Sequence, residues 1–193
     1  MSDHTPAAER TRRAIVEAGI AVLAANPGAS IGEIAAKAAV SRSTFHRYFS
    51  DKAALKKAAA DLAAEAWHTA VERARLAEGT GLEAYRRLCT ELLDRLPALV
   101  WWMSNDGSED APSRPEDEDE TDRKIAAMLR RGHEDGSIDA QLSVEWISNS
   151  VWAVLYAVYF IPAETHGRLS GFEVRQQALR TLLKAAAADP VGI

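Results

Sequence analysis

The sequence contains few cysteine, methionine, proline and aromatic residues. Its 193 residues include one cysteine, three methionines and seven prolines, and only 7% are aromatic. A single cysteine excludes an intrachain disulfide and fits a reducing compartment, so Cys89 is expected to be a small core residue. The longest apolar run, Val151 to Ile161, is too short for the roughly 20 residues that cross a bilayer. Residues 1–13 contain no apolar stretch that would suit a signal peptide. We therefore expect a cytoplasmic protein without a membrane segment.

Motifs of enzymes and metal sites are also missing. The sequence contains no glycine-rich phosphate loop, no nucleophile elbow and no zincin motif. The acidic run 116–120 offers consecutive carboxylates, which diverge from one another and so favour a solvated helix start over a cation site. The run 133–135, His-Glu-Asp, lacks metal-ligand spacing. We expect no catalytic residue, no metal and no cofactor, and predict that the protein is not an enzyme.

Charge is distributed unevenly along the chain. Residues 1–57 hold nine Lys and Arg against five Asp and Glu, whereas the remainder holds 14 against 23. The net charge of −5 therefore hides a basic first quarter on an acidic body. This asymmetry predicts an anionic partner that binds one end of the molecule only.

The composition predicts an all-α fold of about nine helices, because Ala, Leu, Glu and Arg dominate and β-type alternation is weak. Residues 104–119 are expected to form a mobile acidic loop, since they contain no large apolar residue. Beyond the short helices described next, the predicted helices cover about 6–25, 51–76, 80–96, a shorter piece from Pro97, 120 to either 132 or 136, 143–161 and 170–188. Three predicted capping boxes, Ser30/Glu33, Thr80/Glu83 and Ser170/Glu173, mark helix starts.

Residues 30–49 carry the most informative pattern. After the capping box at Ser30, apolar residues recur at helical spacing along 31–38, and a tight break follows at Ala39. Ser41 can then cap a second short helix, with Phe45 and Phe49 on its core face. Two short helices with a basic, hydroxyl-rich outer face are typical of a helix-turn-helix, whose second helix lies in the DNA major groove.

The first 57 residues resemble the DNA-binding domain of the TetR family of bacterial transcription regulators. The residues that carry the resemblance are Thr11, Arg12, Ile15, Ala18, Gly28, Ile34, Ala35, Val40, Ser41, Thr44, Phe45, His46, Tyr48, Phe49, Lys52 and Leu55. The resemblance implies a three-helix DNA-binding domain over residues 6–57 and a helical ligand-binding and dimerisation domain over 58–193. Two positions depart from the family pattern. Ala39 replaces a turn glycine, and alanine is worse at positive φ, while His46 replaces a tyrosine that grips phosphate.

The resemblance also assigns DNA contacts residue by residue. It implies four base-reading residues and four residues that contact phosphate, one of which is also the cap of the first motif helix. The candidate base readers are Arg42, Ser43, Thr44 and Arg47, and the candidate phosphate contacts are Ser30, His46, Tyr48 and Lys52.

Ligand and dimer residues are expected in the C-terminal domain. Aromatic density there favours a pocket for an apolar or cationic ligand, lined by at least one of the candidates Trp67, Trp101 and Trp102, with Met103 as a further wall residue. The helix 143–161 is apolar nearly all round in its second half, so a partner subunit can cover one side of it. By resemblance, the last two long helices form the homodimer interface, with Val151, Trp152, Leu155, Tyr159, Leu179 and Leu183 as candidates.

The sequence therefore predicts a homodimeric DNA-binding transcriptional regulator, most simply a repressor. A small-molecule effector would release it from a palindromic double-stranded DNA operator. Two alternatives remain open at this point. One is a DNA-bound adaptor whose C-terminal domain binds a protein, and the other is a helical enzyme. A cavity of a few hundred Å³ in the C-terminal domain would favour the small-molecule reading.

Overall fold

The computed structural model describes residues 6–105, 118–161, 165, 167 and 169–190. The predicted all-α class is confirmed, and the described residues form eight helices rather than nine. The predicted acidic loop lies mostly outside the described residues, at 106–117. The helices are α1 (Pro6–Ala25), α2 (Ile31–Lys37), α3 (Arg42–Tyr48), α4 (Lys52–Ala74), α5 (Gly81–Asn105), α6 (Glu118–Glu134), α7 (Val144–Phe160) and α8 (Gly171–Ala186).

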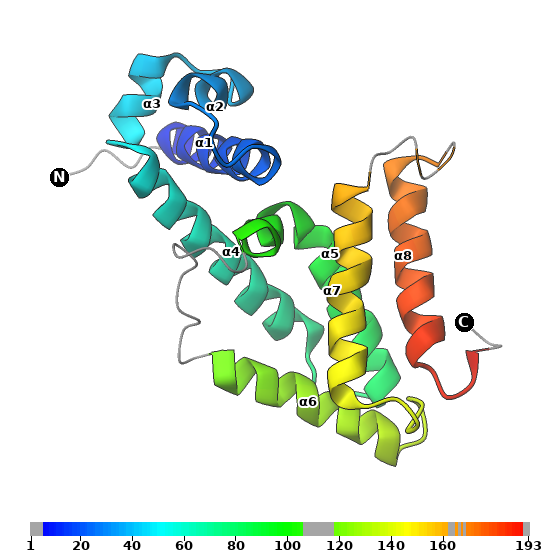
Figure 1. Ribbon diagram of the computed structural model, residues 1–193. Coiled ribbons are helices and arrows are strands. Elements are labelled where there is room, and N and C mark those ends of the chain that lie inside the picture. The colour runs from blue at the N-terminus through cyan, green and yellow to red at the C-terminus, as the bar shows by residue number, and fades with distance from the viewer. Residues whose placement is uncertain (1–5, 106–117, 162–164, 166, 168, 191–193) are drawn as a thin grey trace. The chain divides into compact units, whose positions relative to one another are not determined.

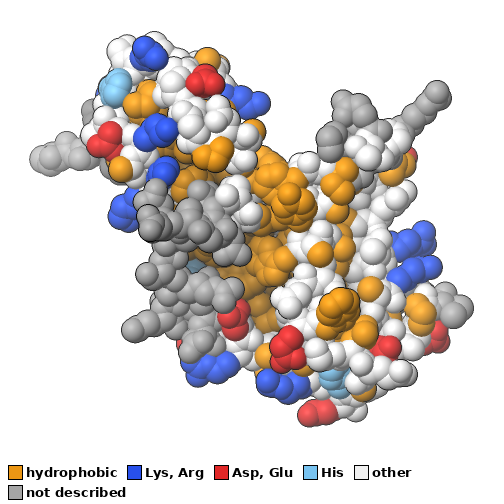
Figure 2. All heavy atoms as spheres, viewed as in Figure 1, with side chains coloured by type: hydrophobic (Ala, Val, Ile, Leu, Met, Phe, Trp, Pro, Cys, Tyr) orange, Lys and Arg blue, Asp and Glu red, His pale blue; other side chains and the backbone are white. Residues whose placement is uncertain are grey.

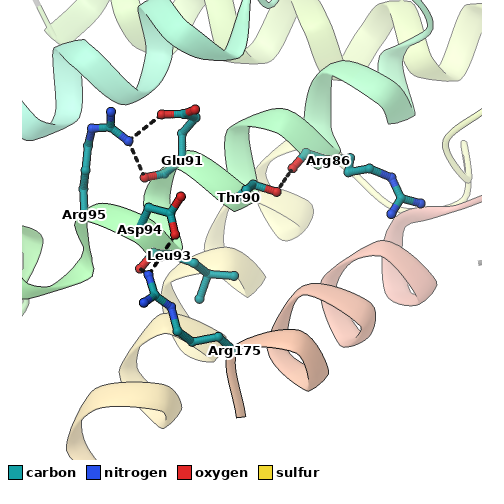
Figure 3. A network of polar contacts seen from close by, with 7 residues as sticks. All are labelled: Arg86, Thr90, Glu91, Leu93, Asp94, Arg95 and Arg175. Carbon is teal, nitrogen blue, oxygen red and sulfur yellow. Dashed lines mark hydrogen bonds and ion pairs between the residues drawn. The ribbon is translucent and has the colours of Figure 1, made fainter. Parts of the chain in front are cut away.

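The difference in helix count arises at Pro97, which lies inside α5 instead of beginning a new helix. Proline has no N–H, so the carbonyl four residues earlier, that of Leu93, loses its usual helical partner. The guanidinium of Arg175 in α8 donates to this carbonyl and also to the Asp94 carboxylate at 3.0 Å (Figure 3). The helix can continue past the proline because a side chain from another helix satisfies the freed carbonyl.

The chain packs as two units. Of the described residues, 6–66 and 97–105 form the head, and 67–96, 118–161 and those between 165 and 190 form the body. Helices α4 and α5 each contribute residues to both units. None of the helices in the described part of the chain is long and apolar enough to cross a membrane.

In the head, α2 packs against α1 and α3 (Figure 1). Ile15, Ile34 and Phe45 are fully buried, and Phe49 is nearly so, which confirms the predicted core face of the motif. Helix α4 packs tightly here, because a Cβ added to Gly19 of α1 would lie 2.8 Å from a methyl of Leu55. The head core thus fixes the orientation of the short helix α3.

In the body, α7 lies beside α8 and packs on α6 (Figure 1). The ends of these helices are joined by bonds between residues far apart in sequence, including a single β-bridge between Ile138 and Ala187. Cys89 is fully buried, as expected, and this burial raises the pKa of its thiol to about 12. A thiol in this state is inert as a nucleophile.

Candidate nucleic-acid interface and cavity

Helix α3 begins at a cluster of three hydroxyl groups. Ser41 adopts an extended conformation before the helix, and its Oγ accepts the backbone N–H of Thr44 at 3.0 Å. The hydroxyls of Ser43 and Thr44 lie 2.8 Å and 2.9 Å from the same Oγ. The predicted N-cap is confirmed, and two candidate base readers are held at the start of the helix.

The outer face of α3 is basic. Phe45 points into the core, whereas Arg42, His46 and Arg47 are exposed. The Arg47 guanidinium lies over the Tyr48 ring, 5.2 Å from its centroid. The Arg42 side chain lies over Gly32 of α2, where an added Cβ would be 2.7 Å from its Nη2. This face therefore presents two guanidinium groups, an imidazole and hydroxyls, which are the groups that read base edges and bind phosphates.

The turn before α3 keeps its shape despite the missing glycine. Ala39 has φ of 55°, in the left-handed region that glycine favours. The N–H of Val40 donates to the Ala35 carbonyl at 2.9 Å, which closes the turn. Ala39 thus adopts the conformation of the turn glycine that it replaces, at the steric cost that a Cβ brings to the left-handed region.

Ser30 and Lys52 meet on the flank of the motif. Ser30 and Glu33 form the predicted capping box, and the bonds from Ser30 lower the pKa of the Glu33 carboxyl. The Lys52 ammonium donates to the carbonyl of Ala29, adjacent to Ser30, at 2.9 Å. The structure thus brings the predicted residues together as two groups, six along α3 and two beside the start of α2.

The body contains a cavity of about 370 Å³. This volume falls in the range of small-molecule sites. Its lining comes from α4, α5, α6 and α7, and most of the lining side chains are hydrophobic. The lining residues are Trp67, Tyr85, Leu88, Leu92, Asp122, Ile125, Ala126, Leu129, Val144, Glu145, Ser148, Asn149, Val151 and Trp152.

Aromatic rings and carboxylates characterise this cavity. The rings of Trp67 and Trp152 stack with centroids 5.6 Å apart and planes 25° apart. Tyr85 is buried in the wall, and burial raises the pKa of its phenol. Asp122 and Glu145 are the acidic members, and none of the described lining residues carries a positive charge. The cavity is therefore suited to a flat ring system with positive charge.

Of the four predicted ligand residues, the structure puts Trp67 in the cavity wall. Trp101 is buried, and Trp102 and Met103 are half-buried, in the part of α5 that belongs to the head. They are not among the described lining residues. Sequence reasoning missed Tyr85, Trp152 and both carboxylates, because four helices supply the wall and no local spacing marks it.

The predicted dimer residues occupy several environments. Val151, Leu155 and Leu183 are almost fully buried within the chain, while Tyr159 and Leu179 are half-buried and Trp152 lines the cavity. The large hydrophobic side chains that are most exposed in the described residues are instead Trp146 at 64%, Tyr156 at 53% and Phe172 at 71%. Figure 2 shows hydrophobic side chains along α7 on the face in view. The sequence analysis did not include Trp146 or Phe172 among the interface candidates.

The described residues contain no group of three or more His, Cys, Asp or Glu that could hold a metal ion.

Comparisons with known proteins cover residues of both the head and the body. Residues 15–59 match the model of the bacterial regulatory proteins of the tetR family. The chain is 33% identical over 153 residues to the HTH-type transcriptional repressor LfrR of Mycolicibacterium smegmatis, covering 79% of each protein.

Solved structures agree with this relationship. The TetR-like transcriptional regulator LfrR from Mycobacterium smegmatis superposes with a TM-score of 0.69 at 30% identity, covering 94% of this chain and 98% of LfrR. LfrR in complex with proflavine gives a TM-score of 0.57 at 30% identity, with 93% and 97% covered. Together with the exposed basic face of α3, these relationships show that the chain belongs to the TetR family of bacterial regulatory proteins and is a DNA-binding transcriptional regulator.

Proposed function

We propose that this regulator is a repressor whose head binds a near-palindromic operator and whose body binds a small molecule that releases it. The observation that carries the proposal is the cavity of about 370 Å³ in the body of a chain whose head presents a helix-turn-helix. A solidly packed body would have favoured an adaptor that binds another protein. The related repressor LfrR, which has been solved with proflavine, supports the same reading.

The head would read DNA through α3. In this proposal Arg42, Ser43, Thr44 and Arg47 contact base edges. Three of them are exposed, and Thr44 is half-buried in the first turn of the helix. Phosphate contacts would come from His46 and Tyr48 on α3 and from the pair formed by Ser30 and Lys52.

The ligand would be a planar aromatic molecule with positive charge. Its ring would stack on the indole pair Trp67 and Trp152, and its charge would be balanced by Asp122 and Glu145. Proflavine, with which LfrR was solved, is a flat cationic dye of this class. The predicted contribution of Trp101, Trp102 and Met103 gains no support from the cavity lining.

Selection of bound duplexes from a random DNA pool, followed by titration with proflavine, tests the whole proposal. We expect recovery of an inverted repeat, and weaker DNA binding when proflavine is bound. DNA affinity that is unchanged at saturating proflavine, or the absence of an inverted repeat, would contradict it.

The charge requirement can be tested separately. Replacing Asp122→Asn and Glu145→Gln together should weaken proflavine binding about tenfold, because two exposed charge pairs are each worth up to about 1 kcal/mol. Binding of acridone, a flat neutral ring system, should be unchanged, and Glu134→Gln, an exposed α6 residue outside the cavity lining, should affect neither compound. Equal losses for proflavine and acridone would show that the carboxylates do not act through charge.

We further propose that the active form is a homodimer, which the two half-sites of an inverted repeat require. The exposed aromatic residues Trp146, Tyr156 and Phe172 favour the outer faces of α7 and α8 as the interface. Light scattering should give a dimer for the wild-type chain and a monomer for Trp146→Glu/Tyr156→Glu. A monomeric wild-type chain at micromolar concentration, or a variant that remains dimeric, would contradict this interface.

A further inference from the structure

Helix α4 is followed by a turn in which one side chain donates hydrogen bonds to several backbone carbonyls. After Ala74, Arg75 adopts φ of 46°, a left-handed conformation that a residue with a Cβ rarely takes. The guanidinium of Arg87 in α5 donates through Nε to the Ala74 carbonyl at 2.7 Å, and through Nη2 to the carbonyls of Arg75 and Glu78. The Ala74 carbonyl belongs to the negative end of the α4 dipole, so a guanidinium is well suited to hold it.

A second arginine ties the same turn to α6. Arg131 donates through Nη2 to the Leu76 carbonyl at 2.7 Å. The start of α5 is also fixed to the end of α6, because the Gly81 N–H donates to the Asp135 carboxylate at 2.8 Å. A Cβ on Gly81 would lie 2.2 Å from the Cα of Gly132, so the two backbones touch. The last residue of α4 with the turn that follows it (74–78), the start of α5 and the end of α6 thus form one junction.

On α5 and α6, the arginines of the junction are close in sequence to residues that line the cavity. Arg87 stands between Tyr85 and Leu88, which line the cavity from α5. Arg131 follows the lining residue Leu129 of α6 by half a turn. A ligand that displaces either helix therefore displaces a guanidinium bonded to the end of α4.

The other end of α4 is anchored in the head. Leu55 packs against Gly19 there, and Lys52 bonds the Ala29 carbonyl. Between its two anchored ends, α4 is a single helix of 23 residues without glycine or proline. It is thus continuous from the DNA-binding unit to the junction.

We propose that Arg87 is the positioning residue that transmits occupancy of the cavity to DNA binding, by making the end of α4 move with α5. The inference rests on the proposed function, since it requires a ligand in that cavity. Arg87 touches neither DNA nor ligand in this scheme. Its removal should therefore reduce the coupling between the two sites while leaving each binding event largely intact.

The test compares Arg87→Lys with Arg86→Lys in the full-length chain. Lysine keeps the charge but cannot reach several carbonyls as the guanidinium fork does. Arg86 is the exposed neighbour, and the bonds to the Ala74, Arg75 and Glu78 carbonyls come from the Arg87 guanidinium instead. The readout is the ratio of DNA dissociation constants with and without saturating proflavine, measured on a duplex selected by the wild-type chain. We expect at least about a fivefold smaller ratio for Arg87→Lys and a wild-type ratio for Arg86→Lys.

A ligand-free arm separates this inference from the proposed function. Ala126 lines the cavity, and Ala126→Trp would place an indole ring in part of it without a ligand. The Ala126→Trp substitution should weaken DNA binding about tenfold when Arg87 is present and less than about threefold in the Arg87→Lys background. If proflavine fails to bind the wild-type chain, the proposed ligand class is wrong. The effect of Ala126→Trp on DNA binding in the two backgrounds still tests the coupling. The role of Arg87 would be overturned if Arg87→Lys left the ratio of DNA dissociation constants with and without proflavine unchanged. It would also be overturned if Ala126→Trp weakened DNA binding equally in both backgrounds.

Discussion

The head and the body of this regulator are stabilised by contacts of different range. In the head, the capping bonds of α2 and α3 join residues three apart, and the turn at Ala39 closes over five residues. In the body, the bonds from Gly81 to Asp135 and from Arg175 to Leu93 join residues 54 and 82 apart. Short-range signals fix the DNA-binding motif, whereas the cavity exists only when distant helices have come together.

The two units also differ in how they expose their functional groups. The candidate DNA contacts on α3 lie on the surface of a short helix, where substitution changes recognition with little effect on packing. The cavity wall includes Trp67, Tyr85 and Leu88, which are also buried core residues of the body. A change of ligand that involves these rings therefore requires repacking of the body core, whereas the DNA contacts of the head can change one side chain at a time.

The largest effect is expected from the close contact of α5 and α6. Gly81→Ala would force a methyl against the Gly132 backbone, and we expect a loss of about 3 kcal/mol in the free energy of unfolding. Gly171→Ala is the matched control, since Gly171 also begins a helix but has open space around it. Urea denaturation followed by tryptophan fluorescence measures both variants. Similar stabilities for the two would mean that the body tolerates movement at this crossing.

A smaller effect, confined to recognition, is expected in the head. Arg47→Ala should weaken operator binding by about 1–3 kcal/mol and relax specificity at one position in each half-site. Lys52→Ala should instead weaken all sequences about equally and reduce the salt dependence. Fluorescence anisotropy with operator and scrambled duplexes distinguishes these outcomes. If Arg47→Ala left the preference for the operator unchanged, its assignment as a base reader would be wrong.

The smallest effect tests the local strain in the turn. Ala39→Gly should raise the free energy of unfolding by about 0.5–1 kcal/mol, because glycine adopts positive φ without steric cost. The neighbouring change Ala38→Gly is the control, since Ala38 has φ of −78° and glycine there should destabilise the helix end. Thermal and urea unfolding should therefore move in opposite directions for the two variants. A loss of stability in both would show that the turn carries no relievable strain.

Sequence patterns predicted the head in detail. The capping box at Ser30, the cap at Ser41 and the buried pair Phe45 and Phe49 are all present in the structure. In the body, the capping boxes at Thr80 and Ser170 are present as well, because capping depends on residues three apart. The pattern failed at Pro97, where a helix end was predicted but Arg175 allows α5 to continue. No local signal could reveal a donor 82 residues away.

The sequence by itself therefore determined the all-α class, the helix-turn-helix and the basic face of α3, because helix starts, turns and amphipathic faces depend on residues within a few positions. Only the tertiary structure decided which tryptophans line the cavity, which carboxylates accompany them and which aromatic side chains of α7 and α8 stay exposed. Those properties depend on how four or more helices pack against one another. The free energy of that packing comes from long-range burial, which no short stretch of sequence encodes.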